Sequence, residues 1–424
     1  MSLEVWRELK GEFEKVGAFS DGEPSARAFS YDEAYLERTN AVPLAPWLSL
    51  TSRPYGPHDY APLFDGMVPE GPMRGELCAR HRVARSDYLG LLELLSDECI
   101  GALMFRSPEA PPSEPGYRQL TAEDAEAFRR DKTAFLVGAV EASRLSLSGA
   151  QGKTGLFLPQ ETDPAEAALA CWAVPLGAAP STHVVKVAGS EHPTLAENEW
   201  LCLEVARRCG LSVARACLPT AFPGAVAVQR FDRTWATGRS TPLRLHQLDF
   251  CQALRLSSYL KYEERPDTCY ARYVGEVVRK QSANALADTV EFAGRALVNY
   301  LLGNCDAHLK NHAFLYSEDW QSKRLAPAYD VVSTTVLGYD RRLAMDIGDH
   351  RVIDEVTPDD LGLLAGDVRL PVRRMKSVAE SIARECRRAL DEFSGGEGPL
   401  AETASAILAD AGPRIAVLAR FTKI

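Results

Sequence analysis

The 424-residue sequence has no CxxC pair and no closely spaced group of cysteines, although it contains ten of them. This spacing argues against a small disulfide-stapled secreted fold. No stretch approaches about 18 uncharged apolar residues, and the charged start MSLEVWRELKGEFEKVG has no apolar signal-peptide core. We therefore expect a soluble, cytoplasmic protein whose cysteines are reduced thiols.

Positive charge is also scarce, because 48 Lys and Arg residues face 58 Asp and Glu residues, a formal net charge of −10. Nucleic acids and anionic membranes are bound mainly by basic side chains, so we expect neither membrane binding nor direct nucleic-acid binding by the chain alone. The composition, 46% hydrophobic and 25% charged, is that of a globular protein. The length exceeds the roughly 250 to 300 residues that one hydrophobic core supports, which predicts several core-bearing units.

The chain divides at a segment rich in proline and glycine. Residues 106–116 hold five such residues in eleven, which is typical of an exposed linker. We expect a small α+β unit over 1–108, a β-rich lobe over 117–232 and a mainly helical lobe over 233–424. Apolar spacing predicts helices over 88–95, 122–132, 197–209, 288–302, 371–393 and 403–408, strands over 183–187, 225–228 and 313–316, and a strand-turn-strand hairpin around 146–158.

Three residues late in the chain have the order expected of a phosphotransferase. Asp306 precedes Asn311 by five positions, the spacing at which a kinase Asp accepts the hydroxyl proton and an Asn holds a metal ion. Asp330 follows a β-like stretch and offers a second carboxylate, and such hard oxygens suit Mg²⁺. The spacing alone occurs often by chance, and a capping or solvated Asp is the alternative.

Two further features of the β-rich part complete this order. Lys186 lies in a valine-rich strand where it would contact an anion, and Glu199 on the next helix could orient it as in protein kinases. A surface lysine and a surface glutamate are the alternative.

The loop preceding this strand resembles a phosphate loop, since small residues let backbone N–H groups approach an anion, but it is also compatible with a simple hairpin turn. The loop is formed by Ser148, Gly149, Ala150, Gln151, Gly152, Lys153 and Thr154. It is not a Walker A motif, because Leu147 stands where the first glycine is required.

The two histidines His308 and His312 are four residues apart and could share one helix face, which raises the possibility of a zinc site. The glutamate of an HExxH motif is absent, because Leu309 follows His308, and no third ligand is evident. We instead interpret His308 as a residue that hydrogen-bonds and orients the Asp306 loop.

Together these motifs resemble the HipA family of bacterial toxin serine/threonine kinases. The matching strings are LSLSGAQGKT at 145–154, THVVK at 182–186, ENE at 197–199, VQRFDR at 228–233, GNCDAHLKN at 303–311 and LAPAYDVVS at 325–333, with FSY at 29–31, LFDGMVPEG at 63–71 and IGAL at 100–103 in the N-terminal part. The resemblance implies an α+β, bilobal protein-kinase-like fold with a β-rich N-lobe, a mainly helical C-lobe and a small α+β N-terminal subdomain.

The resemblance also implies roles for individual residues. Asp306 would be the catalytic base and Lys186 the contact to the ATP phosphates, while Asn311 and Asp330 would bind Mg²⁺. The hinge that reads adenine through its backbone would be formed by Gln229, Arg230 and Phe231. Autophosphorylation would fall on Ser146 or Ser148, and the added negative charge beside the ATP site would inactivate the enzyme. Gly152 stands where relatives carry a glutamate, which removes a charge near the phosphates.

Relatives of this kind phosphorylate an aminoacyl-tRNA synthetase or a similar translation component, and a small helix-turn-helix antitoxin neutralises them. The resemblance implies the same partners here. Two other interpretations stay open, a catalytically silent binding or regulatory protein that keeps the fold and a kinase acting on a small molecule.

Overall fold

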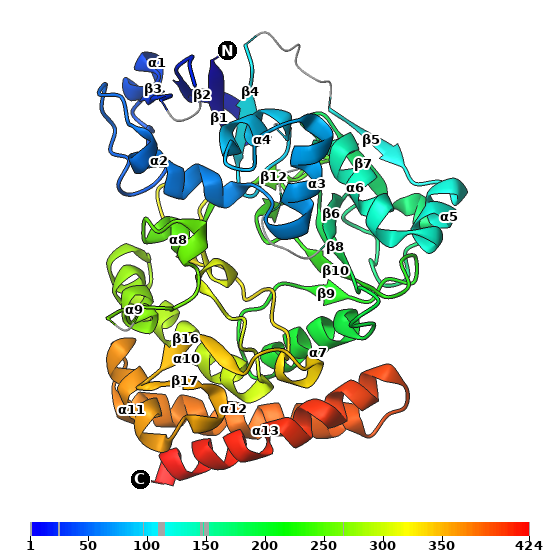
Figure 1. The fold of residues 1–424 in the computed structure, drawn as a ribbon, viewed down its shortest axis with the longest axis vertical. Coiled ribbons are helices and arrows are strands. Elements are labelled where there is room, and N and C mark those ends of the chain that lie inside the picture. The colour runs from blue at the N-terminus through cyan, green and yellow to red at the C-terminus, as the bar shows by residue number, and fades with distance from the viewer. Residues whose placement is uncertain are drawn as a thin grey trace.

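The structure is a computed structural model that describes residues 2–23, 26–95, 97–108, 115–144, 147, 152–265 and 267–423. Three regions follow one another along the chain (Figure 1). An N-terminal unit lies at the top of the view, a second sheet with its helices lies to the right, and a bundle of helices forms the bottom.

The N-terminal unit is a four-stranded antiparallel sheet of order β3-β2-β1-β4, accompanied by four helices. Its strands are β1 (Leu3–Leu9), β2 (Glu12–Phe19), β3 (Phe29–Tyr31) and β4 (Leu103–Arg106), and its helices are α1 (Glu33–Leu36), α2 (Pro57–Phe64), α3 (Gly71–His81) and α4 (Tyr88–Leu94). The expected helix over 88–95 is confirmed as α4, which begins where the Asp87 carboxylate caps the Gly90 N–H. Because β4 returns next to β1, the end of the unit pairs with its beginning.

The middle region contains a four-stranded antiparallel sheet of order β6-β8-β10-β9 and smaller strand pairs. Its elements are β5 (Gly116–Gln119), α5 (Ala122–Arg130), α6 (Lys132–Ser143), β6 (Lys153–Leu156), β7 (Ala173–Leu176), β8 (His183–Val187), α7 (Leu195–Arg208), β9 (Ala216–Cys217), β10 (Ala225–Gln229), β11 (Arg233–Thr234) and β12 (Leu243–Arg244). The strands expected over 183–187 and 225–228 and the helix expected over 197–209 are confirmed.

The hairpin expected around 146–158 is wrong. The chain before the glycine-containing loop is helix α6, which begins at the Asp131 cap and ends at Arg144 in the left-handed conformation. After the loop, β6 pairs with β8 and not with a preceding strand. The N-cap and the apolar run 134–137 favour a helix here, and this local preference outweighs the turn residues that follow.

The C-terminal region is mainly helical, as expected. The strand expected over 313–316 is confirmed, and the region also contains short strands that the sequence pattern did not predict. Its helices are α8 (Phe250–Ala253), α9 (Tyr270–Gln281), α10 (Ala285–Leu302), α11 (Pro358–Asp367), α12 (Val372–Ser394) and α13 (Pro399–Lys423). Its strands are β13 (Gln247–Asp249), β14 (Ala313–Tyr316), β15 (Lys323–Leu325), β16 (Arg342–Ile347) and β17 (His350–Val352). Helices α12 and α13 lie side by side along the bottom of the molecule (Figure 1).

The hydrophobic cores do not follow the expected domain boundaries strictly. The core of the N-terminal unit includes Leu248, Tyr316 and Trp320 from the C-terminal region. The indole N–H of Trp320 donates to the backbone oxygen of Glu8 at 3.2 Å. The first unit therefore packs on the C-terminal region as well as on the middle region, and the boundaries 1–108, 117–232 and 233–424 stay a prediction.

None of the helices described is long and apolar enough to cross a membrane.

Candidate active site

A cavity of about 1430 Å³ lies where the three regions meet. Its walls include Glu70 from the N-terminal unit, Lys186 and Phe231 from the middle region, and Asp306 and Asp330 from the C-terminal region. The fold thus brings Lys186, Asp306 and Asp330, which the sequence picked out for phosphotransfer, to one cavity, although Lys186 and Asp330 lie 144 residues apart in the chain.

Lys186 is held between two carboxylates. Its Nζ atom lies 2.5 Å from Oε1 of Glu199 and 2.6 Å from Oδ1 of Asp330. Burial alone lowers the pKa of the lysine, but attraction to Asp330 and Glu199 outweighs it and raises that pKa, so the side chain is charged. Lys186 therefore links strand β8, helix α7 and the segment that carries Asp330.

Helix α7 fixes this geometry through adjacent residues. Glu199 is fully buried on α7, and so is Asn198. The Asn198 side chain donates to the backbone oxygen of Ser333 and accepts from its N–H, at 3.1 and 2.8 Å. The amide thereby ties the chain three residues beyond Asp330 to the helix that presents Glu199.

Asp330 has an unusual backbone. Its φ of +57° is left-handed, a conformation that non-glycine residues adopt rarely and at a cost of about 1 to 3 kcal/mol. Burial raises the pKa of its carboxyl, but Lys186 and Lys153 lower it well below the ordinary range, which keeps the group ionised. Strain and a forced negative charge at one residue are typical of a functional position.

The loop bearing Asp306 follows helix α10. The helix ends at Gly303, whose φ is +72°, and a Cβ atom there would lie 2.0 Å from Oγ1 of Thr335. Only glycine fits this turn. The loop then closes on itself, because the backbone N–H of His308 and the side-chain amide of Asn311 both donate to the backbone oxygen of Asp306, at 2.7 and 2.9 Å.

The Asp306 carboxylate has one direct side-chain partner in the described chain. The Tyr262 hydroxyl donates to Oδ1 at 2.7 Å. Burial raises the pKa of Asp306, the Tyr262 hydrogen bond lowers it, and the charge of Asp330 raises it, with a net increase. A carboxylate with a raised pKa is a better proton acceptor than an ordinary aspartate.

Two oxygen atoms remain for a metal ion. The Nδ2 atom of Asn311 donates to the backbone oxygen of Asp306, and Oδ1 of Asp330 accepts from Lys186. The other side-chain oxygens, Asn311 Oδ1 and Asp330 Oδ2, have no hydrogen-bond partner among the described residues. The same part of the chain has no cluster of three or more His, Cys, Asp and Glu side chains that could hold a metal. Two protein oxygens fit Mg²⁺, which usually completes its octahedron with water and phosphate oxygens.

His308 lies beside this pair without the hydrogen bond expected of it. Its ring meets the Tyr262 ring edge to face with centroids 5.2 Å apart, and its buried Nδ1 atom has no partner in the described chain. Burial lowers its pKa to about 3, so the ring is neutral. It is His308's backbone, together with this ring contact, that supports the loop.

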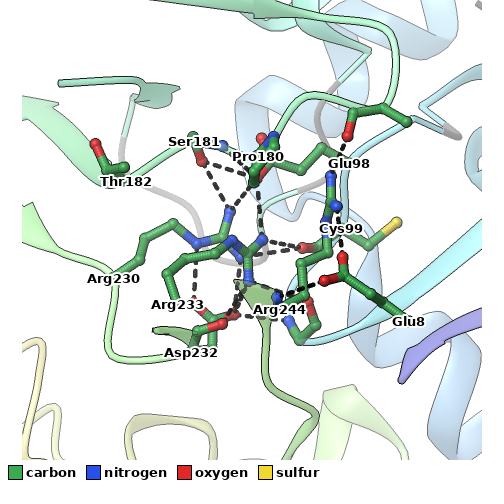
Figure 2. A network of polar contacts seen from close by, with 12 residues as sticks. Glu8, Glu98, Cys99, Pro180, Ser181, Thr182, Arg230, Asp232, Arg233 and Arg244 are labelled. Carbon is green, nitrogen blue, oxygen red and sulfur yellow. Dashed lines mark hydrogen bonds and ion pairs between the residues drawn. The ribbon is translucent and has the colours of Figure 1, made fainter. Parts of the chain in front are cut away.

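The segment expected to act as the hinge is locked to the N-terminal unit by a buried network (Figure 2). The Arg230 guanidinium binds the Asp232 carboxylate at 2.8 Å, Oε1 of Glu98 at 3.2 Å and the Cys99 oxygen at 3.0 Å. Arg233 binds the same Glu98 oxygen at 3.0 Å. The Arg230 side chain is therefore engaged in contacts that join the middle region to the N-terminal unit.

The backbone of this segment leaves one N–H group available. The N–H groups of Gln229 and Arg230 donate to the oxygens of Arg215 and Thr182, at 2.7 and 2.9 Å. The N–H of Phe231 has no hydrogen-bond partner among the described residues, and this residue lines the cavity. Of the three expected hinge residues, Phe231 has the N–H group that can meet a ligand.

The expected phosphate loop is described only in part. Gly152 and Lys153 line the cavity. Burial lowers the pKa of Lys153 to about 8, with Asp330 opposing and Lys186 adding to that shift. Ser146, Ser148, Gly149, Ala150 and Gln151 lie outside the described residues.

Comparison with known proteins accounts for both halves of the molecule. Residues 145–390 match the HipA-like C-terminal domain and residues 9–106 match the HipA N-terminal domain. The chain belongs to the HipA family. The strings on which the resemblance rested fall inside these two segments.

Individual HipA-like relatives extend the match to most of the chain. A Sinorhizobium fredii protein named "Putative kinase Y4mE" is 30% identical over 89% of this chain and 90% of its own length. The "Serine/threonine-protein kinase toxin HipA" of Shewanella oneidensis is 28% identical over 81% of this chain and 79% of its own. The solved structure of Shewanella oneidensis HipA, in a complex with HipB and operator DNA, covers 100% of this chain and 99% of that one with a TM-score of 0.80 and 23% identity, so it shows the same fold.

Four residues of this HipA-family site were not singled out from the sequence. They are Glu70, Lys261, Tyr262 and Lys310. Glu70 and Lys310 stand inside strings that carried the resemblance, so a signal existed for them. Tyr262 and Lys261 precede the loop by more than 40 residues and stand in no motif, and only the folded chain brings them to Asp306.

Proposed function

We propose that this protein is an ATP- and Mg²⁺-dependent serine/threonine protein kinase toxin of a toxin-antitoxin pair. The observation that carries the proposal is Lys186, which is ion-paired with both Glu199 and Asp330 on the wall of the cavity that also holds Asp306. This is the lysine, helix glutamate, metal aspartate and base set that phosphoryl transfer from ATP requires.

The proposed roles follow from the contacts of each residue. Lys186 contacts the ATP phosphates, Glu199 orients it, and Asn311 and Asp330 hold Mg²⁺ through their remaining oxygens. When bound, Mg²⁺ neutralises negative charge on the transferred phosphoryl group. Asp306 accepts the proton of the attacking hydroxyl, and Tyr262 orients its carboxylate.

The nucleotide would lie between the hinge and the phosphate loop. The Phe231 N–H is available to the adenine edge, while Gln229 and Arg230 fix the strand end through their backbone bonds. Lys153 at the start of β6 and Gly152 directly before it line the cavity and would reach the phosphates. Ser148, Gly149, Ala150 and Gln151 would complete the loop, and Ser146 or Ser148 would be the autophosphorylated serine.

The protein partners are proposed from the family. Shewanella oneidensis HipA forms a complex with HipB and operator DNA, which supports a small helix-turn-helix antitoxin as a partner of this chain too. For the substrate we propose a translation component such as an aminoacyl-tRNA synthetase. The relative named a serine/threonine-protein kinase toxin supports a protein hydroxyl as the acceptor.

The proposal is tested by incubating dephosphorylated protein with γ-labelled ATP and Mg²⁺. We expect label on the wild-type protein and none on the variants Asp306→Asn and Asp330→Asn. Robust labelling of both variants would sink the assignment. The absence of an ATP/Mg²⁺ thermal shift in the wild type would instead favour a silent protein of the same fold, because a ligand that binds the native state raises the melting temperature. Phosphate found on a metabolite and never on protein would identify a small-molecule kinase.

A further inference from the structure

The N-terminal unit places one carboxylate beside the catalytic loop. Glu70 stands at the N-cap position of helix α3 and lines the cavity. Its Oε1 atom lies 2.5 Å from Nζ of Lys310 and its Oε2 atom lies 2.8 Å from Nζ of Lys261. Burial alone would raise the pKa of Glu70, but the two lysines lower it to about 2, so the group is ionised at any physiological pH.

Lys310 is part of the catalytic loop itself. It directly precedes Asn311, its side chain is buried, and its Nζ atom also donates to the Gly66 oxygen at 3.0 Å. Its backbone oxygen accepts from the Tyr329 hydroxyl at 2.7 Å, and Tyr329 directly precedes Asp330. The lysine thus joins the loop on one side to the N-terminal unit and on the other to the metal-binding segment.

Lys261 joins Glu70 to the other side of the same loop. Its backbone oxygen accepts from the Leu309 N–H at 3.2 Å. The next residue is Tyr262, whose hydroxyl donates to Asp306. One carboxylate therefore holds both the segment that orients the Asp306 side chain and the residue next to Asn311.

We propose that Glu70 is a positioning residue, by which the N-terminal unit sets the geometry of Asp306 and Asn311. The inference rests on the proposed phosphotransfer function and adds to it that the N-terminal unit is part of the catalytic machinery. Glu70 touches neither the base nor the amide, and it acts through Lys261 and Lys310. Displacing catalytic groups by about 1 Å can lower a rate by about 100-fold, so this positioning affects the rate of transfer more than ATP binding.

A matched control distinguishes positioning from simple attachment of the unit. Glu8 and Arg244 form another buried ion pair between the N-terminal unit and the rest of the chain, 2.8 Å long. Neither residue lines the cavity. Glu8→Gln weakens attachment of the unit in the same chemical way as Glu70→Gln, without touching the loop.

The experiment measures the single-turnover rate of phosphate incorporation into the dephosphorylated full-length protein, by intact mass, over a series of ATP concentrations. For Glu70→Gln we expect a maximal rate about 10- to 100-fold lower, with the half-saturating ATP concentration within about threefold of wild type. For Glu8→Gln we expect a maximal rate within about threefold of wild type. Melting temperatures of all variants are measured alongside, and rates are compared where every variant is folded.

Lys310→Met and Lys261→Met each remove one of the two ion pairs of Glu70, and they keep the proposal testable if Glu70→Gln does not fold. In the double variant Glu70→Gln/Lys310→Met the losses should be less than additive, because the two residues act as one unit. A wild-type maximal rate in Glu70→Gln, or a loss equal to that of Glu8→Gln, overturns the inference and leaves the proposed function standing. A wild-type protein that transfers no phosphate overturns the proposed function, and this inference with it.

Discussion

The Tyr262 hydroxyl donates a 2.7 Å hydrogen bond to Oδ1 of Asp306 and joins two segments 44 residues apart. The same ring meets His308 edge to face. The orientation of the proposed base is therefore set from outside its own loop.

Replacing Tyr262 by phenylalanine should change the pH dependence of phosphate transfer. The hydroxyl stabilises the charged form of Asp306 and so lowers its pKa, against burial and the charge of Asp330, which raise it. Loss of the hydroxyl raises the pKa of Asp306. Since the base must be unprotonated, the rate falls on the acid side, and the acid limb of the pH–rate profile should move to higher pH. An acid limb that stays at the wild-type pH or moves to lower pH would show that Asp306 is not the titrating base.

Replacing Lys186 by methionine should abolish most of the activity. The variant loses the cation proposed for the phosphates and leaves the Glu199 and Asp330 carboxylates without the lysine between them. We expect at least about a 100-fold lower transfer rate, the scale typical of losing one charge-stabilising group. Glu199→Gln keeps Lys186 and should lose less. Radiometric transfer assays decide this, and a rate near wild type for Lys186→Met would contradict the assignment.

Glu98→Ala should destabilise the protein. It removes one of the two carboxylates that pair with both Arg230 and Arg233, the other being Asp232, and breaking a buried pair in this way costs about 3 to 5 kcal/mol. The melting temperature of the variant should be clearly lower than that of the wild type. Glu204→Gln is the control, because Glu204 pairs with an exposed Arg207 and such pairs contribute about 0 to 1 kcal/mol. Equal melting temperatures for the two variants would mean that the network in Figure 2 contributes little to stability.

The sequence predicted the long, strongly patterned elements and missed those that depend on distant partners. Helix α10 and strand β8 were expected within a few residues, since their apolar spacing is regular. The strands β13 and β17 have three residues each, too few for an alternating pattern to be evident. Helix α6 was not predicted, because the turn residues that follow it favour a hairpin, although Asp131 is a good N-cap.

The candidate site shows the same division. Asp306, Asn311, Lys186 and Asp330 were identified by residue type and order, and the fold places all four on one cavity. Tyr262 stands in no motif, and Glu70 was not identified although it stands in the string 63–71; the importance of both lies in contacts that only the folded chain makes. Nothing local predicts that the Glu70 carboxylate will meet a lysine 240 residues later.

The most direct test of the proposed kinase is the intact mass of dephosphorylated protein before and after incubation with ATP and Mg²⁺, with peptide mapping of residues 140–155. We predict a mass increase of one phosphate on Ser146 or Ser148, or of two phosphates on both serines, absent in Asp306→Asn. An unchanged wild-type mass, or an equal increase in Asp306→Asn, would contradict the account.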